Sequence, residues 1–218
     1  MRFSRRKFVA GIGGVGISSS IGGCLSDDDI RRETDFEPSE IDTDDRPSLG
    51  DTDAPVYVTV FEDFSCPSCR QFKMEIFNFI VNQYVESGDV RYLHADWPIP
   101  VDEEWSYAIP NAAHEVFDQL GRSAFWSFSG LMYENQDQYS NEVIRESVNA
   151  VMEQLDIENN NVIADDVINA AENSHYREKI ASDRDLGNEI GVEATPTVFV
   201  NSTVVPPTDV ESEIEDRL

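Results

Sequence analysis

Two cysteines three residues apart, Cys66 and Cys69, constrain this chain more than any other feature. They follow an apolar, β-branched run at residues 56–61 that is typical of a buried strand. A segment with helical periodicity comes next, and Pro67 suits the first turn of a helix, where its missing N–H costs nothing. Two thiols at such a strand-to-helix turn can form a dithiol–disulfide switch.

A zinc site is the alternative interpretation of this spacing. Structural zinc usually takes four Cys or His ligands. The third cysteine, Cys24, and the three histidines at 94, 114 and 175 supply no second paired motif. We therefore expect no metal, and no cofactor beyond the redox-active cysteine pair itself. The histidines are expected to be structural or surface residues.

Residues 1–23 have the features of a targeting segment outside the fold. Residues 4–8, Ser-Arg-Arg-Lys-Phe, form a twin-arginine signal. The Gly-rich stretch that follows is too short and too polar for a membrane span. It ends in Gly22-Gly23-Cys24, which resembles the lipobox of exported lipoproteins and implies cleavage before Cys24 and a lipid on its thiol. Ordinary cleavage nearby, leaving Cys24 free of lipid, is the alternative.

Acidic residues dominate the rest of the chain. Residues 24–53 have many aspartates and few large apolar side chains, so we predict a flexible tether there. The net charge is −27, and becomes −31 without the four basic residues of 1–23. This composition resembles that of extreme halophile proteins, and no run has the spacing of an EF-hand loop that would favour a calcium-binding alternative. Binding to nucleic acid is excluded by the lack of a basic face.

Residues 54–218 are long enough for one domain with a sizeable core. Strands are predicted at 56–61, 90–96, 197–200 and, as a short edge strand, 204–205. Helical periodicity links the first two strands in a right-handed βαβ unit that ends its helix at Gly88. It also fills 103–187, where Pro110 predicts a kink or a late helix start, and a final helix covers 209–218. This order resembles an α/β thioredoxin-like fold, a central mixed sheet flanked by helices, with an inserted mostly helical subdomain at about 103–187.

Three stretches carry a more specific resemblance. They are FEDFSCPSC at 61–69, FWSFSGLMYENQ at 125–136 and GVEATPTVFVN at 191–201. In this order they resemble the DsbA-like thiol–disulfide oxidoreductases that have a helical domain inserted into thioredoxin. The aromatic residues of the second stretch, Phe125, Trp126 and Phe128, are expected to be core residues because of their helical spacing.

The resemblance implies a role for each residue of the cysteine motif. Cys66 should be the attacking thiol, because a helix N-terminus stabilises its thiolate. Cys69, one turn into the helix, should be more buried and resolve the mixed disulfide. Pro67 and Ser68 should adjust the redox potential. Some family members have His in place of Ser68, so we hypothesise a weaker oxidant than those members.

Two further regions complete the implied site. Thr195 and Pro196 should face Cys66, with Pro196 cis and the neighbouring backbone open to an extended client. Many relatives carry a buried acid where this chain has Val60, which leaves the proton path to Cys69 open, with water as one route. Glu62 and Asp63 lie nearby but not in the same register. Separately, Asn201 begins an Asn-Ser-Thr glycosylation sequon.

These observations predict an exported, membrane-tethered, monomeric thiol–disulfide oxidoreductase that oxidises cysteines in unfolded exported proteins. The family implies a membrane quinone-linked partner that reoxidises it. An extracytoplasmic reductase for specific partners is the first alternative. A non-catalytic tethered chaperone or adaptor with a structural cysteine pair is the second. An isomerase is disfavoured, because no separate dimerisation domain precedes the thioredoxin unit.

Overall fold

The computed structural model describes residues 30–41, 46–158 and 161–218. These residues form one mixed sheet in the order β1-β6-β5-β3-β4-β2, in which β3 and β4 run parallel and every other neighbouring pair is antiparallel. The strands are β1 (Arg32–Glu33), β2 (Ser48–Leu49), β3 (Val56–Glu62), β4 (Val90–Asp96), β5 (Thr197–Val200) and β6 (Thr203–Val205).

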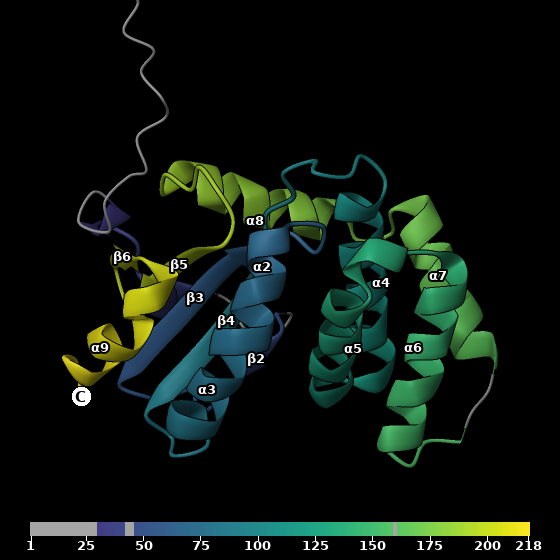
Figure 1. Ribbon diagram of the computed structural model, residues 1–218, viewed down its shortest axis with the longest axis horizontal. Helices are drawn as coiled ribbons and strands as arrows, with labels where there is room; N and C mark the ends of the chain where they lie inside the picture. Colours follow the sequence, from purple (N-terminus) through teal and green to yellow (C-terminus); the bar gives the residue numbers. More distant parts are fainter. Residues whose placement is uncertain (1–29, 42–45, 159–160) are drawn as a thin grey trace, which may run out of the picture.

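Helices cover both faces of the sheet and extend beside it (Figure 1). The α-helices are α2 (Pro67–Phe72), α3 (Asn78–Ile80), α4 (Trp105–Leu120), α5 (Arg122–Glu134), α6 (Asn141–Gln154), α7 (Asn161–Asn173), α8 (Arg177–Glu189) and α9 (Val210–Glu215). Two π-helical segments are η2 (Lys73–Phe77) and η3 (Val81–Val85), and three 3₁₀ turns are η1 (Pro38–Glu40), η4 (Gln136–Gln138) and η5 (Pro207–Asp209). The predicted fold class is confirmed.

The central strand β3 is buried on both faces, which explains its nearly continuous apolar sequence. Val58 and Val60 pack into the larger core cluster, which also holds side chains of the 67–85 helical stretch and of α9. Phe61 points to the opposite face and packs in a second cluster, where α8 contributes Leu186. The strand therefore needs cover from two helical layers, and it ends where the cysteine turn begins.

The stretch 67–85 is helical throughout, but α turns alternate with π turns. π turns widen a helix locally and often occur at functional sites. Here the first π segment turns both Lys73 and Phe77 inward, and Lys73 is only 2% exposed. A buried lysine one turn beyond Cys69 was not expected from the sequence.

Helices α4 to α7 form the predicted helical insertion beside the sheet (Figure 1). The expected late start near Pro110 is wrong, because α4 begins at Trp105 and continues through that proline. The predicted insertion also included α8. Since Leu186 of α8 packs with the sheet side chains of the second cluster, this helix covers the sheet as part of the central unit.

The prediction of a flexible tether is wrong for residues 30–41 and 46–49, which we call the N-terminal strap. Its β1 pairs with β6, and its β2 pairs with β4 on the opposite edge of the sheet. Phe36 is 4% exposed, and its ring centroid lies 4.9 Å from that of Phe199. Arg46 forms an ion pair with the buried Asp183 of α8. Strand β6 is consequently not an edge strand, because β1 lies outside it.

The predicted targeting segment and Cys24 lie outside the described residues. Within the part of the chain that the structure describes, no helix is both long enough and apolar enough to span a membrane.

If the strap is an integral part of the fold, Phe36→Ala should lower the free energy of unfolding by about 3 kcal/mol, because a buried aromatic ring is lost from the core. Phe79→Ala is the matched control, since Phe79 is 38% exposed and its truncation should cost much less. Urea denaturation followed by fluorescence measures both. Equal, small losses for the two variants would show that the strap contributes nothing to stability.

Candidate active site

The cysteine turn sits at the end of β3, with Cys66 as the N-cap of α2. The helical insertion holds this turn from the other side. The Gln136 side chain donates to the carbonyls of Phe64 at 2.7 Å and Cys66 at 2.8 Å, and the Tyr139 hydroxyl donates to the Phe64 carbonyl at 2.8 Å. Gln136 is the last residue of the second sequence motif. Its contacts with the cysteine turn could not be predicted from the sequence.

The two cysteines are free thiols in different environments. A hydrogen bond from the Cys69 thiol lowers the pKa of Cys66 to about 5. Burial opposes this shift, whereas the Thr195 side chain and the backbone N–H groups of Cys69 and Ser68 reinforce it. At neutral pH Cys66 is therefore a thiolate, the form that attacks disulfides and is displaced from them.

Cys69 has no exposed surface, and its chemistry is the opposite. Burial raises the pKa of the Cys69 thiol well above its ordinary value, and the Cys66 sulfur and the Glu62 carboxylate raise it further. Cys69 consequently keeps its proton at neutral pH. The pair is therefore asymmetric. Cys66 is a thiolate that is 5% exposed, and Cys69 is an enclosed, protonated thiol.

The loop before β5 places its backbone beside Cys66. The Cys66 sulfur lies 3.4 Å from the Thr195 carbonyl oxygen, to which it donates when it is protonated, and the Thr195–Pro196 peptide bond is cis. Thr195 is itself buried. In contrast, the Pro67 and Ser68 side chains are exposed beside the sulfur, and Ser68 acts on the thiolate through its backbone N–H.

A buried acid does lie near Cys69, although Val60 occupies the position where relatives carry one. Side chains two residues apart on a strand share a face, so Glu62 points to the same side of β3 as Val60. Glu62 is 1% exposed, and it raises the pKa of Cys69. The expectation that Glu62 lies in the wrong register is therefore wrong: the alternation of β3 places it on the face of Cys69.

Glu62 belongs to a chain of buried titratable groups. Its Oε2 lies 3.0 Å from Nδ1 of His94, whose Nε2 lies 3.0 Å from Oδ1 of Asp96. The other Asp96 oxygen lies 2.6 Å from Nε2 of His114 on α4. Burial lowers the pKa of His94, but the Asp96 and Glu62 carboxylates outweigh it and raise the pKa to about 9. Burial raises the pKa of Asp96, but the two histidines outweigh this effect and hold the pKa well below its ordinary value.

Asp63, the next residue along, faces the active-site turn instead. Its carboxylate accepts the N–H groups of Ser65 at 2.7 Å and Ile99 at 2.9 Å. Burial nevertheless raises the pKa of Asp63 to about 7, and the Cys66 sulfur adds to the increase. A thiolate and a carboxylate therefore compete for one proton at this turn.

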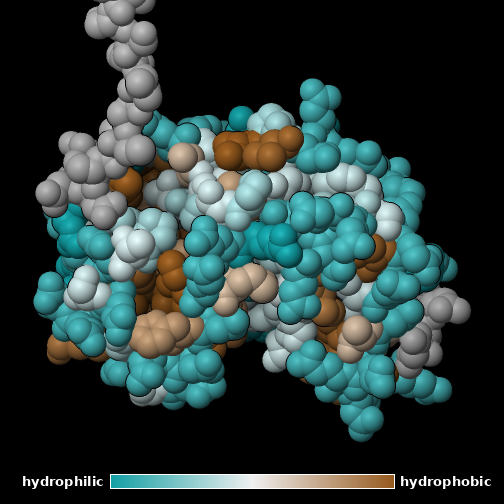
Figure 2. All heavy atoms as spheres, viewed as in Figure 1, coloured by the Kyte–Doolittle hydropathy of each residue, from teal (hydrophilic) through white to brown (hydrophobic). Residues whose placement is uncertain are grey.

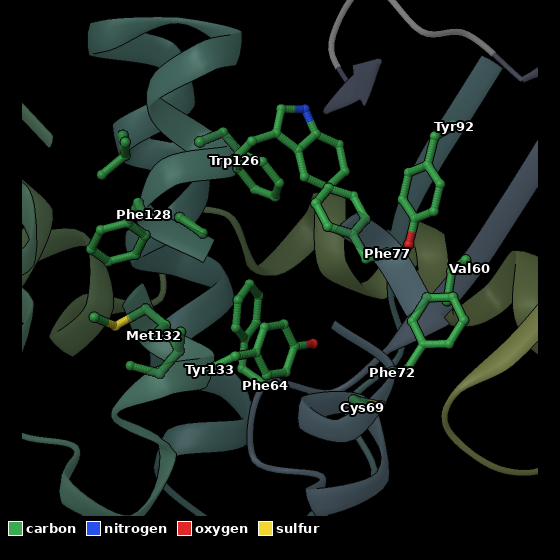
Figure 3. Close-up of a cluster of buried hydrophobic side chains, with 14 of the residues drawn as sticks. Val60, Phe64, Cys69, Phe72, Phe77, Tyr92, Trp126, Phe128, Met132 and Tyr133 are labelled. Carbon is green, nitrogen blue, oxygen red and sulfur yellow. The ribbon is translucent and has the colours of Figure 1, made fainter. Parts of the chain in front are cut away.

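Cys69 belongs to a core cluster that is rich in aromatic side chains. Phe64 stacks on Tyr133 of α5 with ring centroids 4.9 Å apart, and Tyr92 of β4 packs against Trp126 at 5.5 Å. Figure 3 shows Cys69 in this cluster together with Val60. The predicted core positions, Phe125, Trp126 and Phe128, are confirmed as buried.

Asn201 lies in the tight turn between β5 and β6, at a φ of 52°. Its side-chain oxygen accepts the Tyr57 N–H at 2.8 Å, so the residue already has a structural role. Its glycosylation stays a prediction. Among residues 30–41, 46–158 and 161–218, no group of three or more His, Cys, Asp or Glu side chains has an arrangement that could hold a metal ion.

The cause of the low Cys66 pKa can be tested by removing its partner. Cys69→Ala should raise the pKa of Cys66 from about 5 towards the ordinary thiol value, because the largest stabilising hydrogen bond is lost. Ser68→Ala should leave the pKa unchanged, since that residue acts through its backbone. Ultraviolet absorbance of the thiolate as a function of pH measures both variants. A shift in the Ser68 variant instead would place the effect in the serine hydroxyl.

The chain is similar in sequence to known proteins. The thioredoxin family profile matches residues 42–215. The chain is 29% identical over 163 residues to the probable disulfide bond formation protein D of Bacillus cereus, covering 73% of this chain and 72% of that protein. It is 26% identical over 160 residues to disulfide bond formation protein D of Bacillus subtilis, covering 73% and 69% respectively.

Solved structures share the fold. Oxidised BdbD from Bacillus subtilis superimposes with a TM-score of 0.66 at 24% identity, over 81% of this chain and 94% of that one. DsbA from Chlamydia trachomatis superimposes with a TM-score of 0.65 at 20% identity, over 83% and 92%. With a family match over most of its length and a thiolate–thiol pair at the end of β3, the chain belongs to the thioredoxin family and is a protein disulfide oxidoreductase of the DsbA-like type.

Proposed function

We propose that this oxidoreductase forms disulfides in cysteine-containing exported proteins. The observation that carries the proposal is the asymmetry of the pair, a stabilised thiolate at Cys66 against a protonated thiol at Cys69. A thiol whose pKa falls from about 8.5 to about 5 stabilises the reduced protein by roughly 2.7 kcal/mol at pH 7, or about 60 mV. A favoured reduced form makes the disulfide a stronger oxidant.

The direction of this effect with pH follows from the sign of the shift. Because the Cys66 pKa is depressed, the stabilisation of the reduced form is complete above the ordinary thiol pKa and is lost as the pH falls through about 5. Relative to an ordinary dithiol at the same pH, the oxidising character should therefore be strongest at neutral and alkaline pH.

Client binding is expected on the surface beside Cys66. The Thr195 backbone lies next to the sulfur, and an extended chain that pairs with this loop would present its cysteine to Cys66. On reaction, the client thiolate displaces Cys69, and a second client thiolate then releases reduced Cys66. A membrane quinone-linked partner would restore the disulfide.

We further propose a location outside the cytoplasmic membrane. The twin-arginine segment would direct export, and a lipid on Cys24 would hold the monomeric domain at the outer face; simple secretion is the alternative. The visible face of the molecule in Figure 2 is largely hydrophilic. With a net charge of −27 and only three lysines, such a surface suits an environment of high salt, which screens self-repulsion.

A reductase for specific exported partners is the second candidate function. Two observations favour it. Ser68 stands where a charged residue would support the thiolate, and the Asp63 carboxyl beside Cys66 disfavours negative charge on the sulfur. Both features should lower the reduction potential. The tethered adaptor with a structural cysteine pair is not pursued, because the chain is an enzyme by its family and its two thiols are free.

The reduction potential of the Cys66–Cys69 pair decides between these two functions. We expect a value near or above about −180 mV, as in protein oxidants, measured by equilibration with glutathione buffers at multimolar salt. A value near or below about −270 mV would match a reductase instead. The full chain lacking only the signal segment should be used, so that the strap is kept.

Client oxidation provides the second test. The oxidised protein should introduce a disulfide into a reduced, unfolded two-cysteine protein, and Cys66→Ala should abolish this activity because the attacking sulfur is gone. Cys69→Ala should also abolish it, because a lone Cys66 cannot form the Cys66–Cys69 disulfide that accepts the electrons of the client. Activity that survives Cys66→Ala would assign the reaction to other groups.

A further inference from the structure

Glu62, His94 and Asp96 form a hydrogen-bonded set of buried titratable groups near Cys69. Glu62 uses only Oε2 to contact His94, and Oε1 has no hydrogen-bond partner within the described residues. This carboxylate is the buried acid that acts electrostatically on Cys69. Oε2 of Glu62 thus contacts the histidine, and Oε1 is left free to exchange a proton with the thiol through a water molecule.

The two contacts of His94 indicate that this set holds an additional proton. An ionised carboxylate can only accept hydrogen bonds, and a neutral imidazole has one N–H. His94 nevertheless contacts Glu62 through one nitrogen and Asp96 through the other, each at 3.0 Å. Both contacts are hydrogen bonds only if the three groups share a second proton, on His94 or on one of the acids. That proton can move along the contact towards Glu62.

The surroundings of Glu62 keep bulk water away from this proton. Lys73 from η2, Tyr92 from β4 and Tyr133 from α5 are buried, and their polar atoms have no hydrogen-bond partner within the described residues. Burial raises the pKa of both tyrosines well above the ordinary value, so they keep their protons. The Lys73 amine lies 3.4 Å from the Phe77 ring centroid, and burial lowers its pKa to about 7.

Charge compensation at the far end supports the same arrangement. Asp96 is held between His94 and His114, and its N–H donates to Asp183 at 2.9 Å. Asp183 in turn pairs with Arg46 of the strap. An ionised Asp96 favours positive charge on His94, and this keeps the shared proton within the set of buried groups.

We propose that Glu62, His94 and Asp96 form a buried proton store for Cys69, in which Glu62 passes the proton and His94 and Asp96 are positioning residues that hold it. The inference rests on the proposed function, because it concerns the thiol–disulfide exchange of the same cysteine pair. The store takes the place of the buried acid that many relatives carry where this chain has Val60. Its own acid, Glu62, lies at a different position of the strand and acts together with His94 and Asp96.

A client thiolate attacks the Cys66 sulfur, the Cys66–Cys69 bond breaks, and its electron pair leaves with Cys69. Cys69 takes the stored proton and becomes a thiol. The second client thiol loses its proton to solvent and attacks the client sulfur of the mixed disulfide, which releases Cys66 as a thiolate. The client dithiol is oxidised, the protein disulfide is reduced, and the store is refilled from solvent.

The test measures reduction of the oxidised protein by dithiothreitol, in stopped flow with tryptophan fluorescence. Comparing Glu62→Gln with the wild-type protein at each pH cancels the ionisation of the reductant. At pH 7 we expect the variant to be slower by about tenfold or more, since an internal acid is lost. The His94 pKa is raised to about 9, so the stored proton is present below that pH and lost above it. The two rates should therefore converge above about pH 9.

Two controls separate this role from a structural one. Lys73→Met keeps an apolar stem against Phe77 and Trp126, and should keep the wild-type pH profile, although it removes the other buried base near Glu62. His94→Gln should slow the reaction below pH 9 as Glu62→Gln does. A constant rate ratio at all pH values would mean that Glu62 acts only on stability.

The proposal is overturned if Glu62→Gln reacts like the wild-type protein, or if Lys73→Met alone changes the profile. Should the Glu62 variant not fold, the wild-type rate corrected for the reductant thiolate must still fall above about pH 9, and a flat profile would overturn the proposal. Reduction by dithiothreitol needs no client protein, and it does not depend on whether the protein works as an oxidase or as a reductase. Failure of disulfide formation in clients would therefore leave this result unaffected, and the two failures can be told apart.

Discussion

Buried charge must be compensated within the protein, and in this molecule that requirement connects every layer. Glu62 ends β3, Asp96 ends β4, His114 lies on α4 and Asp183 on α8, and Arg46 belongs to the strap. Removing one member of such a set leaves an uncompensated charge in a low-dielectric interior, which is strongly destabilising. This set of contacts therefore couples the packing of the sheet, the insertion and the strap. In the resulting arrangement the carboxylate of Glu62 lies near the cysteine pair.

The chemistry of the site results from two neighbouring environments that differ in solvent access. At the mouth of the turn, hydrogen bonds converge on the Cys66 sulfur and favour its charge. One helical turn further in, Cys69 is buried in the same core cluster as Phe64, Tyr92 and Tyr133, and its charge is disfavoured. Two identical side chains thus acquire different roles because the strand ends at the surface while the helix returns to the core.

Local sequence patterns predict the parts of this structure that depend on local forces. The apolar run of β3, the proline after Cys66 and the periodicity of α4 to α8 each follow from short-range preferences, and the three motifs together indicate the family. The ordered structure of the strap was not predicted, because its composition is mainly acidic and single buried apolar residues such as Phe36 do not stand out in it. The proton store was missed because His94 and Asp96 become neighbours of Glu62 only through the parallel pairing of β3 with β4. Lys73 faces inward because of a π turn that no propensity signals.

Strands β1 and β2 of the strap cover the two edges of the sheet, and this has a consequence for an enzyme that is proposed to act on unfolded clients. Extended polypeptides add readily to a free sheet edge, where they would be held without reacting. Here each outermost strand within the described residues is only two residues long, so it offers little template for an incoming chain. The proposed client site, the backbone beside Thr195, lies against the reactive sulfur instead. Closing the edges thus reserves strand addition for the encounters that lead to chemistry.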